Sequence, residues 1–268
     1  MTFKNYDTIS ENVKNQIERV REIWSRHLGG DLIGIYLHGS LALGYFQEDV
    51  SDIDILILSG RKLTRTQRLA IAGDILEADQ NPCPLEMSAI WIHDLWPWKH
   101  PTSCQFHYSA YWTERYRALM QDETGECFIV DHDFEDADIA CHVKLTRQCG
   151  IRVCGKEIDE VFPEVPESDF WQSISTDIDH YDFNAYKPEY FASNILILGR
   201  ILSYKKEGRI LSKYEGGLWT LAHVPEQYRY IIENALNAWY EKDEFRECRA
   251  EDLNGLREFL IEEIKACD

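Results

Sequence analysis

The chain has 268 residues, of which 44% are hydrophobic and 28% are charged. This balance is ordinary for a globular protein and excludes long-range disorder. Lys and Arg number 28 and Asp and Glu number 47, so the formal net charge is 28 − 47 = −19. Because a nucleic-acid backbone is bound by basic surfaces, this charge argues against a nucleic-acid partner and favours a cationic ligand. The length predicts two domains or one large one.

The sequence shows none of the usual marks of export. No segment reaches the roughly 18 consecutive apolar residues that a membrane span requires, and residues 1–10 do not resemble a signal peptide. The eight cysteines include no C-x-x-C pair, so free thiols are favoured over disulfides or a zinc site. We therefore expect a cytoplasmic protein without a membrane partner.

The first half of the chain alternates helical and strand patterns. Apolar residues recur at helical spacing over 10–28, where Ser10 can cap the start of the helix. Short apolar runs predict three strands, and a second helix is predicted between the last two. The strands are 32–37, 53–58 and 85–92, and the second helix is 64–78. This order of elements predicts an α/β or α+β domain.

The second half of the chain is mainly helical. A helix is predicted over 133–148, and a loop over 155–166 follows it with two prolines. Helical spacing of apolar residues then returns and persists to the end of the chain. We therefore predict a domain boundary near residue 157 and a helical second domain over 158–268.

The residues that point to chemistry follow the first predicted strand and open the second. Gly39 and Ser40 come directly after the first strand, and Asp52 and Asp54 begin the second. Residues i and i+2 of a strand lie on one side, so both carboxylates can converge on one cation, and such hard oxygen ligands suit Mg²⁺. A glycine–serine turn offers backbone N–H groups and a hydroxyl to a phosphate. Together they predict group transfer from a nucleoside triphosphate.

A glycine–serine turn followed by Asp-x-Asp on the next strand resembles the nucleotidyltransferase superfamily that includes DNA polymerase β. The longer run YLHGSLALGYFQEDVSDIDILIL is similar to the aminoglycoside (3'')(9) adenylyltransferase family, the streptomycin and spectinomycin resistance enzymes. The resemblance extends over most of residues 32–240. It implies an α+β protein with a polymerase-β-like nucleotidyltransferase domain, a mixed sheet with helices, over 1–157. A C-terminal α-helical bundle over 158–268 would complete the ATP and antibiotic sites.

Glu86 occupies the place of the family's catalytic base. It alternates with Leu85 and Met87, so it leaves the apolar side of its predicted strand and can face Asp52 and Asp54. There it can take a proton from an attacking hydroxyl. The resemblance implies that Glu86 also contacts the substrate and joins the two aspartates as a metal ligand. It further implies Mg²⁺, with two ions expected, and ATP as the co-substrate.

The resemblance also assigns nucleotide contacts. Gly39, Ser40 and Ser51 match the family's residues on the phosphate and metal side. In the helical domain, Arg200 and Lys213 match two basic residues that contact the ATP phosphates. Trp239 falls where the family has a tyrosine near the nucleotide.

For the acceptor, the resemblance implies substrate contacts at Trp112 and Asp182. The dual-specificity members have a tryptophan and two acids before the helix that carries the arginine, and streptomycin binding is attributed to these residues. Aligned on Arg200, those places hold Tyr181, Tyr186 and Tyr190. This departure favours spectinomycin over streptomycin as the substrate.

The charge distribution agrees with a cationic acceptor. Residues 121–190 hold 18 acids and 5 bases, so 5 − 18 = −13 of the total charge lies in about a quarter of the chain. Aminoglycosides and aminocyclitols carry several amino groups, and an acidic surface raises the local concentration of such ligands.

The predicted reaction is the transfer of AMP from MgATP to the 9-hydroxyl of spectinomycin, with the 3''-hydroxyl of streptomycin as a second candidate. Two alternatives stay open at this point. One is the same fold acting on another acceptor, such as a lincosamide or a side chain of a partner protein. The other is a non-catalytic nucleotide-binding module, although a pure binder has no need of a base beside a metal site. We expect a monomer that acts on small molecules.

Overall fold

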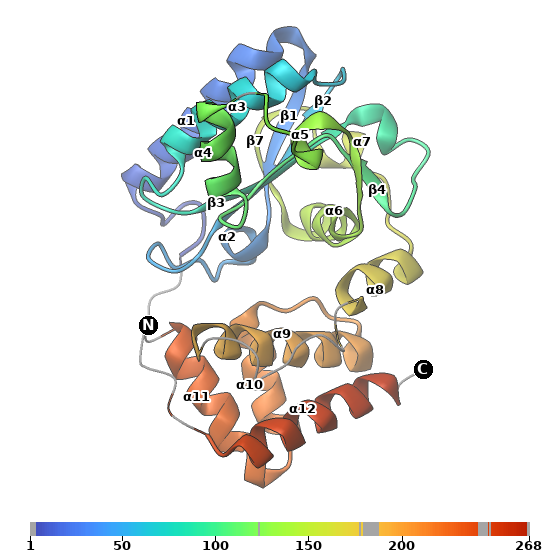
Figure 1. The fold of residues 1–268 in the computed structure, drawn as a ribbon. Coiled ribbons are helices and arrows are strands. Elements are labelled where there is room, and N and C mark those ends of the chain that lie inside the picture. The colour runs from blue at the N-terminus through green and yellow to red at the C-terminus, as the bar shows by residue number, and fades with distance from the viewer. Residues whose placement is uncertain are drawn as a thin grey trace. The chain divides into compact units, whose positions relative to one another are not determined.

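The structure, a computed structural model, describes residues 4–122, 124–176, 178, 188–240, 246 and 248–266. It divides into two compact units, Thr2–Ser173 and Ile174–Asp268 (Figure 1). The first unit combines a sheet with helices and the second is helical, which confirms the predicted α+β class. Each unit is described below by itself.

A mixed five-stranded sheet forms the centre of the first unit (Figure 1). Its strands in spatial order are β5 (Phe106–Tyr108), β3 (Leu85–Trp91), β2 (Ile53–Ser59), β1 (Leu32–Leu37) and β7 (Ile151–Gly155). β2 and β3 are parallel, and the other neighbouring pairs are antiparallel. The three strands that the sequence predicted are therefore confirmed, and they are the three central ones.

One face of the sheet carries the main hydrophobic core. The helices on this side are α1 (Glu11–Leu28), α3 (Arg65–Ala78) and α4 (Thr113–Gln121), shown in Figure 1. Ile55 of β2 and Met87 of β3 are buried in this core with Trp24 of α1. Because strand side chains alternate between faces, Asp54 and Glu86 point to the other side of the sheet.

The other face of the sheet is covered by different helices. The main one is α6 (Asp138–Cys149), which packs against the short α2 (Gly39–Leu43) (Figure 1). α2 directly follows β1, and its Leu41 is buried in the main core. The short α7 (Ile158–Val161) follows β7, and next to it Phe162 packs edge-on against Tyr36 of β1 at 4.9 Å between ring centroids. α2 and α6 thus flank the face to which the carboxylates point.

Several elements of the first unit differ from the sequence prediction. The predicted helix 133–148 begins only at Asp138, because β6 (Phe134–Asp136) pairs with β4 (Thr102–Cys104) in a separate two-stranded sheet. The edge strands β5 and β7 were not predicted, and neither was α5 (Phe128–Asp131). Short 3₁₀ turns lie at Gly29–Asp31, Ile92–Asp94 and Glu226–Tyr228.

The division between the units lies later than the predicted boundary near residue 157. The cause is α8 (Glu167–Ser175), most of which is anchored to the first unit. The Ser173 hydroxyl accepts a hydrogen bond from the Cys141 backbone N–H at 3.2 Å. The Trp98 Nε1–H donates to the Asp169 carboxylate at 2.8 Å.

The second unit is a set of helices, as predicted. They are α9 (Pro188–Glu207), α10 (Lys213–His223), α11 (Arg229–Tyr240) and α12 (Ala250–Lys265). α9 packs closely on α10. The lack of a side chain at Gly216 allows this approach, since a Cβ there would lie only 2.5 Å from Cγ of Arg200. Within the described residues, no helix has the length and apolar character needed to cross a membrane.

Candidate active site

Two carboxylates lie side by side on the face opposite the main core. Asp54 of β2 and Glu86 of β3 are direct partners in the parallel register, and both are partly buried. Asp52 stands two residues before Asp54, just ahead of β2, and is exposed. The strand pairing therefore brings Asp54 and Glu86 together, and the convergence of Asp52 with them stays a prediction.

Asp54 is held against the start of α2. The Asp54 backbone carbonyl accepts a hydrogen bond from the His38 N–H at 3.0 Å. Gly39 has a φ of 61°, and a Cβ at this position would lie 1.7 Å from Oδ2 of Asp54. Only glycine fits here, for its backbone angle and for the absence of a side chain. The Gly39–Ser40 segment and the Asp54 carboxylate are thus in direct contact, as a nucleotide site requires.

The electrostatics of the pair centre on Glu86. Burial, followed by the neighbouring Asp54 charge, raises the pKa of Glu86 from 4.5 to about 7. The charges of Asp52 and Asp138 raise this pKa further, and His142 opposes them. Glu86 is therefore poorly solvated and lies near other carboxylates, with too little positive charge to balance them.

Asp138 and His142 are functional neighbours that the sequence did not reveal. Both lie on α6, four residues apart and so on one face of the helix. His142 also approaches His38, with 4.7 Å between the ring centroids, and burial holds the pKa of His38 well below its ordinary value. The spacing of Asp138 and His142 is a signal in the sequence, but only the fold brings α6 to β3.

The donor set fits a magnesium ion that is shared with a nucleotide. Asp52, Asp54 and Glu86 supply hard carboxylate oxygens, and the raised pKa of Glu86 reflects negative charge that a divalent cation would offset. Within the described residues, no three His, Cys, Asp or Glu side chains are arranged as a metal site. Magnesium that is bound together with a nucleotide takes phosphate oxygens and waters as further ligands.

The two predicted serines differ in their local roles. Ser40 lies in α2 directly after Gly39, and its backbone carbonyl accepts from the Tyr45 N–H at 2.9 Å. The Ser51 hydroxyl accepts from the Gln47 N–H at 3.0 Å, and the Ser51 N–H donates to the Gln47 carbonyl at 2.8 Å. Ser51 thus closes the loop that leads into Asp52, and its phosphate contact stays a prediction.

Of the predicted substrate residues other than Glu86, the described part of the chain places only Trp112. Trp112 packs against the core on the opposite face of the sheet and meets Phe128 edge-on, with 5.6 Å between ring centroids. This placement favours a packing role for Trp112. Asp182, together with Tyr181 and Tyr186, lies outside the described residues.

Two of the predicted nucleotide residues meet within the second unit. Lys213 is the first residue of α10, and its Nζ lies 4.2 Å from the ring centroid of Trp239 on α11. Arg200 lies on α9 where Gly216 lets α10 approach. The helical packing therefore joins Lys213 with Trp239, which the sequence linked only through the resemblance.

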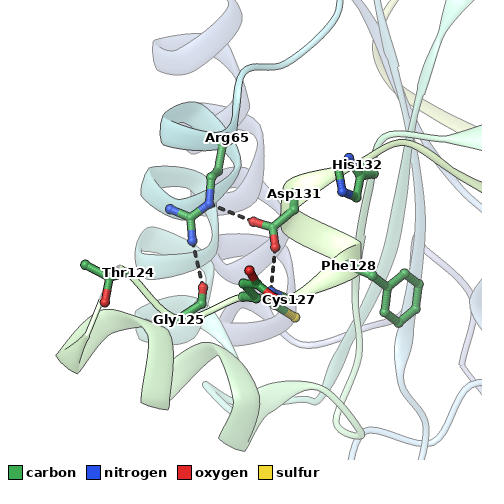
Figure 2. A pocket seen from close by; sticks show the side chains of 8 residues that line it. Arg65, Thr124, Gly125, Cys127, Phe128, Asp131 and His132 are labelled. Carbon is green, nitrogen blue, oxygen red and sulfur yellow. Dashed lines mark hydrogen bonds and ion pairs between the residues drawn. The ribbon is translucent and has the colours of Figure 1, made fainter.

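A separate pocket of about 590 Å³ lies between α3 and the segment that leads into α5 (Figure 2). Its basic group is already paired, because Arg65 binds the Asp131 carboxylate at 2.7 Å and the Gly125 carbonyl at 2.8 Å. Asp131 also accepts from the Cys127 N–H at 2.6 Å. The pocket contains none of the predicted site residues, and its hydrogen bonds brace the wall that Figure 2 shows.

Comparison with known proteins places this geometry in a family. Residues 13–126 match the family described as "Nucleotidyltransferase domain". Residues 160–263 match the family described as "Aminoglycoside adenylyltransferase, C-terminal domain". The chain belongs to the aminoglycoside adenylyltransferase family. It is accordingly a nucleotidyltransferase, and the sheet edge with Asp54 and Glu86 falls within the first matched segment.

Relatives in this family align over nearly the whole chain. An aminoglycoside (3'')(9) adenylyltransferase of Klebsiella pneumoniae is 25% identical, over 96% of this chain and 97% of its own. A spectinomycin 9-adenylyltransferase of Campylobacter jejuni is 26% identical, over 93% and 95%. The fold matches spectinomycin adenyltransferase AAD(9) from Enterococcus faecialis, solved with ATP and spectinomycin, with a TM-score of 0.80, 23% identity, and coverage of 94% and 99%.

The charge of Glu86 predicts a pH-dependent stability of the metal-free protein. Because the folded-state pKa is raised from 4.5 to about 7, protonation of Glu86 stabilises the fold fully below pH 4.5, and this contribution is lost as the pH rises through about 7. In EDTA, Glu86→Gln should therefore raise the melting temperature by roughly 5 °C near pH 8 and by little near pH 4.5. Thermal unfolding across this range measures the difference.

A matched control is Glu77→Gln, which changes an exposed glutamate on α3. It should leave the melting temperature unchanged at both pH values. An equal effect of Glu86→Gln at the two ends of the range would contradict the assigned charge crowding.

Proposed function

We propose that this enzyme transfers AMP from MgATP to a hydroxyl of spectinomycin and so confers resistance to that antibiotic. The observation that carries the proposal is the pairing of Asp54 with Glu86 at one register, next to a glycine that touches the Asp54 carboxylate. It is supported by relatives named for spectinomycin and by a structural neighbour solved with ATP and spectinomycin.

The reaction follows from the positions of these groups. Gly39 and Ser40 bind the triphosphate through backbone N–H groups and the Ser40 hydroxyl. Asp52 and Asp54 would hold magnesium, with Glu86 beside them, and the bound ion would neutralise charge at the phosphates. Glu86 accepts the proton of the antibiotic hydroxyl, whose oxygen forms the new bond to the α-phosphorus. The bond to the bridging oxygen of the β-phosphate breaks, and pyrophosphate leaves.

The raised pKa of Glu86 suits a general base. A carboxyl group with a pKa of about 7 is a stronger proton acceptor than an ordinary glutamate and is still largely ionised slightly above neutral pH. Asp54 contributes to this pKa and is itself a proposed metal ligand. The same crowding that disfavours ionisation of Glu86 thus makes it a better base.

In the second unit, we propose that Lys213 and Arg200 bind the ATP phosphates and that Trp239 contributes near the nucleotide. The 4.2 Å contact of Lys213 with Trp239 holds the ammonium group against an aromatic face and keeps its charge in place. The proposed acceptor side includes Glu86 and Asp182. The acidic segment 121–190, with a net charge of −13, would attract the cationic antibiotic.

We further propose that the enzyme acts as a cytoplasmic monomer with two magnesium ions per active site. The cytoplasm supplies the ATP that the reaction consumes. Spectinomycin is the preferred antibiotic in this proposal, because Tyr181, Tyr186 and Tyr190 replace the residues to which streptomycin binding is attributed.

Replacing the base should separate binding from turnover. Glu86→Gln should keep MgATP binding within about twofold and lower kcat for spectinomycin adenylylation by at least about 10²-fold, because general base catalysis typically contributes that much. Pyrophosphate release measures turnover, and calorimetry measures ATP binding. A variant with near-wild-type kcat would exclude Glu86 as the base.

Lys213→Ala should weaken MgATP binding by about tenfold through the loss of a charge-assisted phosphate contact, and should leave spectinomycin binding unchanged. Calorimetry with each ligand measures this difference. The control is Lys14→Ala on α1, where the lysine pairs with Glu11 at the surface and has no proposed ligand. A loss of spectinomycin affinity with full ATP affinity would show that Lys213 serves the acceptor instead.

A further inference from the structure

The start of α2 depends on a residue from a distant part of the chain. His38 immediately precedes Gly39 and is only 4% exposed, yet its side chain does not cap the helix. Its ring instead lies against His142 of α6, with 4.7 Å between centroids and 33° between ring planes. The imidazole of His38 is therefore used for packing against α6.

His38 in turn fixes two groups of the active site. Its backbone N–H donates to the Asp54 carbonyl at 3.0 Å, and the following Gly39 touches the Asp54 carboxylate. Any shift of His38 would move the Gly39–Ser40 segment relative to Asp54. The ring contact between His142 and His38 is thus linked to the proposed phosphate-binding groups through the peptide bond from His38 to Gly39.

The Nδ1 atom of His142 does not explain the position of the ring. Nδ1 of His142 is buried and has no hydrogen-bond partner among the described residues. A buried, unsatisfied nitrogen costs free energy, so a phenylalanine ring of similar shape would be tolerated here. What His142 offers to α2 is the flat face of its ring.

We propose that His142 is a positioning residue for the nucleotide: its ring on α6 packs against His38 and fixes the Gly39–Ser40 segment beside Asp54. This inference rests on the proposed function for the identity of the nucleotide. It adds α6 to the elements that build the site, through a side chain that touches no substrate. The prediction is a change in nucleotide affinity that depends on the shape of residue 142 and not on its nitrogens.

Three substitutions test the role of the ring. His142→Ala removes the ring and should raise both the KM for ATP and the Kd for a non-hydrolysable MgATP analogue by roughly fivefold, with the KM for spectinomycin unchanged. His142→Phe keeps a planar ring and should restore both values to within about twofold of wild type. His142→Leu, similar in volume but without a ring, should resemble His142→Ala and replaces it if that variant does not fold.

The control for general damage to α6 is Val143→Ala, which removes buried methyl groups from the neighbouring position. It should lower the melting temperature without changing the Kd for the MgATP analogue. If His142→Ala lowers the melting temperature and leaves nucleotide binding unchanged, His142 is merely structural and the inference fails. If His142→Phe is as impaired as His142→Ala, a ring nitrogen acts instead and the inference also fails.

The readouts keep this inference separate from the proposed function. Binding of the MgATP analogue is measured by calorimetry and needs no acceptor. Wild-type protein that binds the analogue but does not adenylylate spectinomycin would overturn the proposed acceptor, and the His142 variants would still decide the present inference. Wild-type turnover of spectinomycin together with normal nucleotide affinity of His142→Ala would overturn only the inference.

Discussion

The site depends on holding two acidic side chains close together, although carboxylates repel each other and are better solvated when they are apart. Asp54 and Glu86 are register partners on the two parallel strands of the sheet, so the strand pairing itself enforces their proximity. The sheet and its hydrophobic core supply the free energy that holds the two charges in place. Burial, together with the repulsion from Asp54, raises the pKa of Glu86 and favours the binding of a cation. Nucleotidyl transfer uses both consequences.

The remaining structure can be understood as support for this pair. On one face, α1 and α3 bury the alternate residues of β2 and β3 and fix the strands. On the other, α2 brings Gly39 against Asp54, and α6 adds Asp138 and His142. Long-range contacts therefore set both the chemistry of the carboxylates and the position of the phosphate-binding segment.

The sequence predicted what local patterns encode. Alternating and helical spacing identified the central strands and α1, and the Gly39–Ser40 and Asp52–Asp54 pattern identified the edge of the site. The edge strands β5 and β7 were not predicted because they have only three and five residues, too few to show a clear pattern. Residues 134–136 precede a helix along the chain, but they pair with β4, which no local pattern indicates.

The role of individual residues shows the same limit. Glu86 was predictable because its strand alternates clearly and the family motif marks it. His142 and Asp138 were not, because their proximity to Glu86 exists only once α6 packs beside the sheet. Trp112 shows the converse: the resemblance implied a substrate contact, and its actual neighbours are core residues.

The central claim is that Asp54 and Glu86 share a poorly solvated, negatively charged space. The most direct test is an NMR titration of ¹³C-labelled Glu86 in EDTA, in the wild type and in Asp54→Asn. The account predicts a pKa of about 7 in the wild type, and a clear fall toward 4.5 when the Asp54 charge is removed. A wild-type pKa near 4.5, or a value that Asp54→Asn does not change, would contradict it.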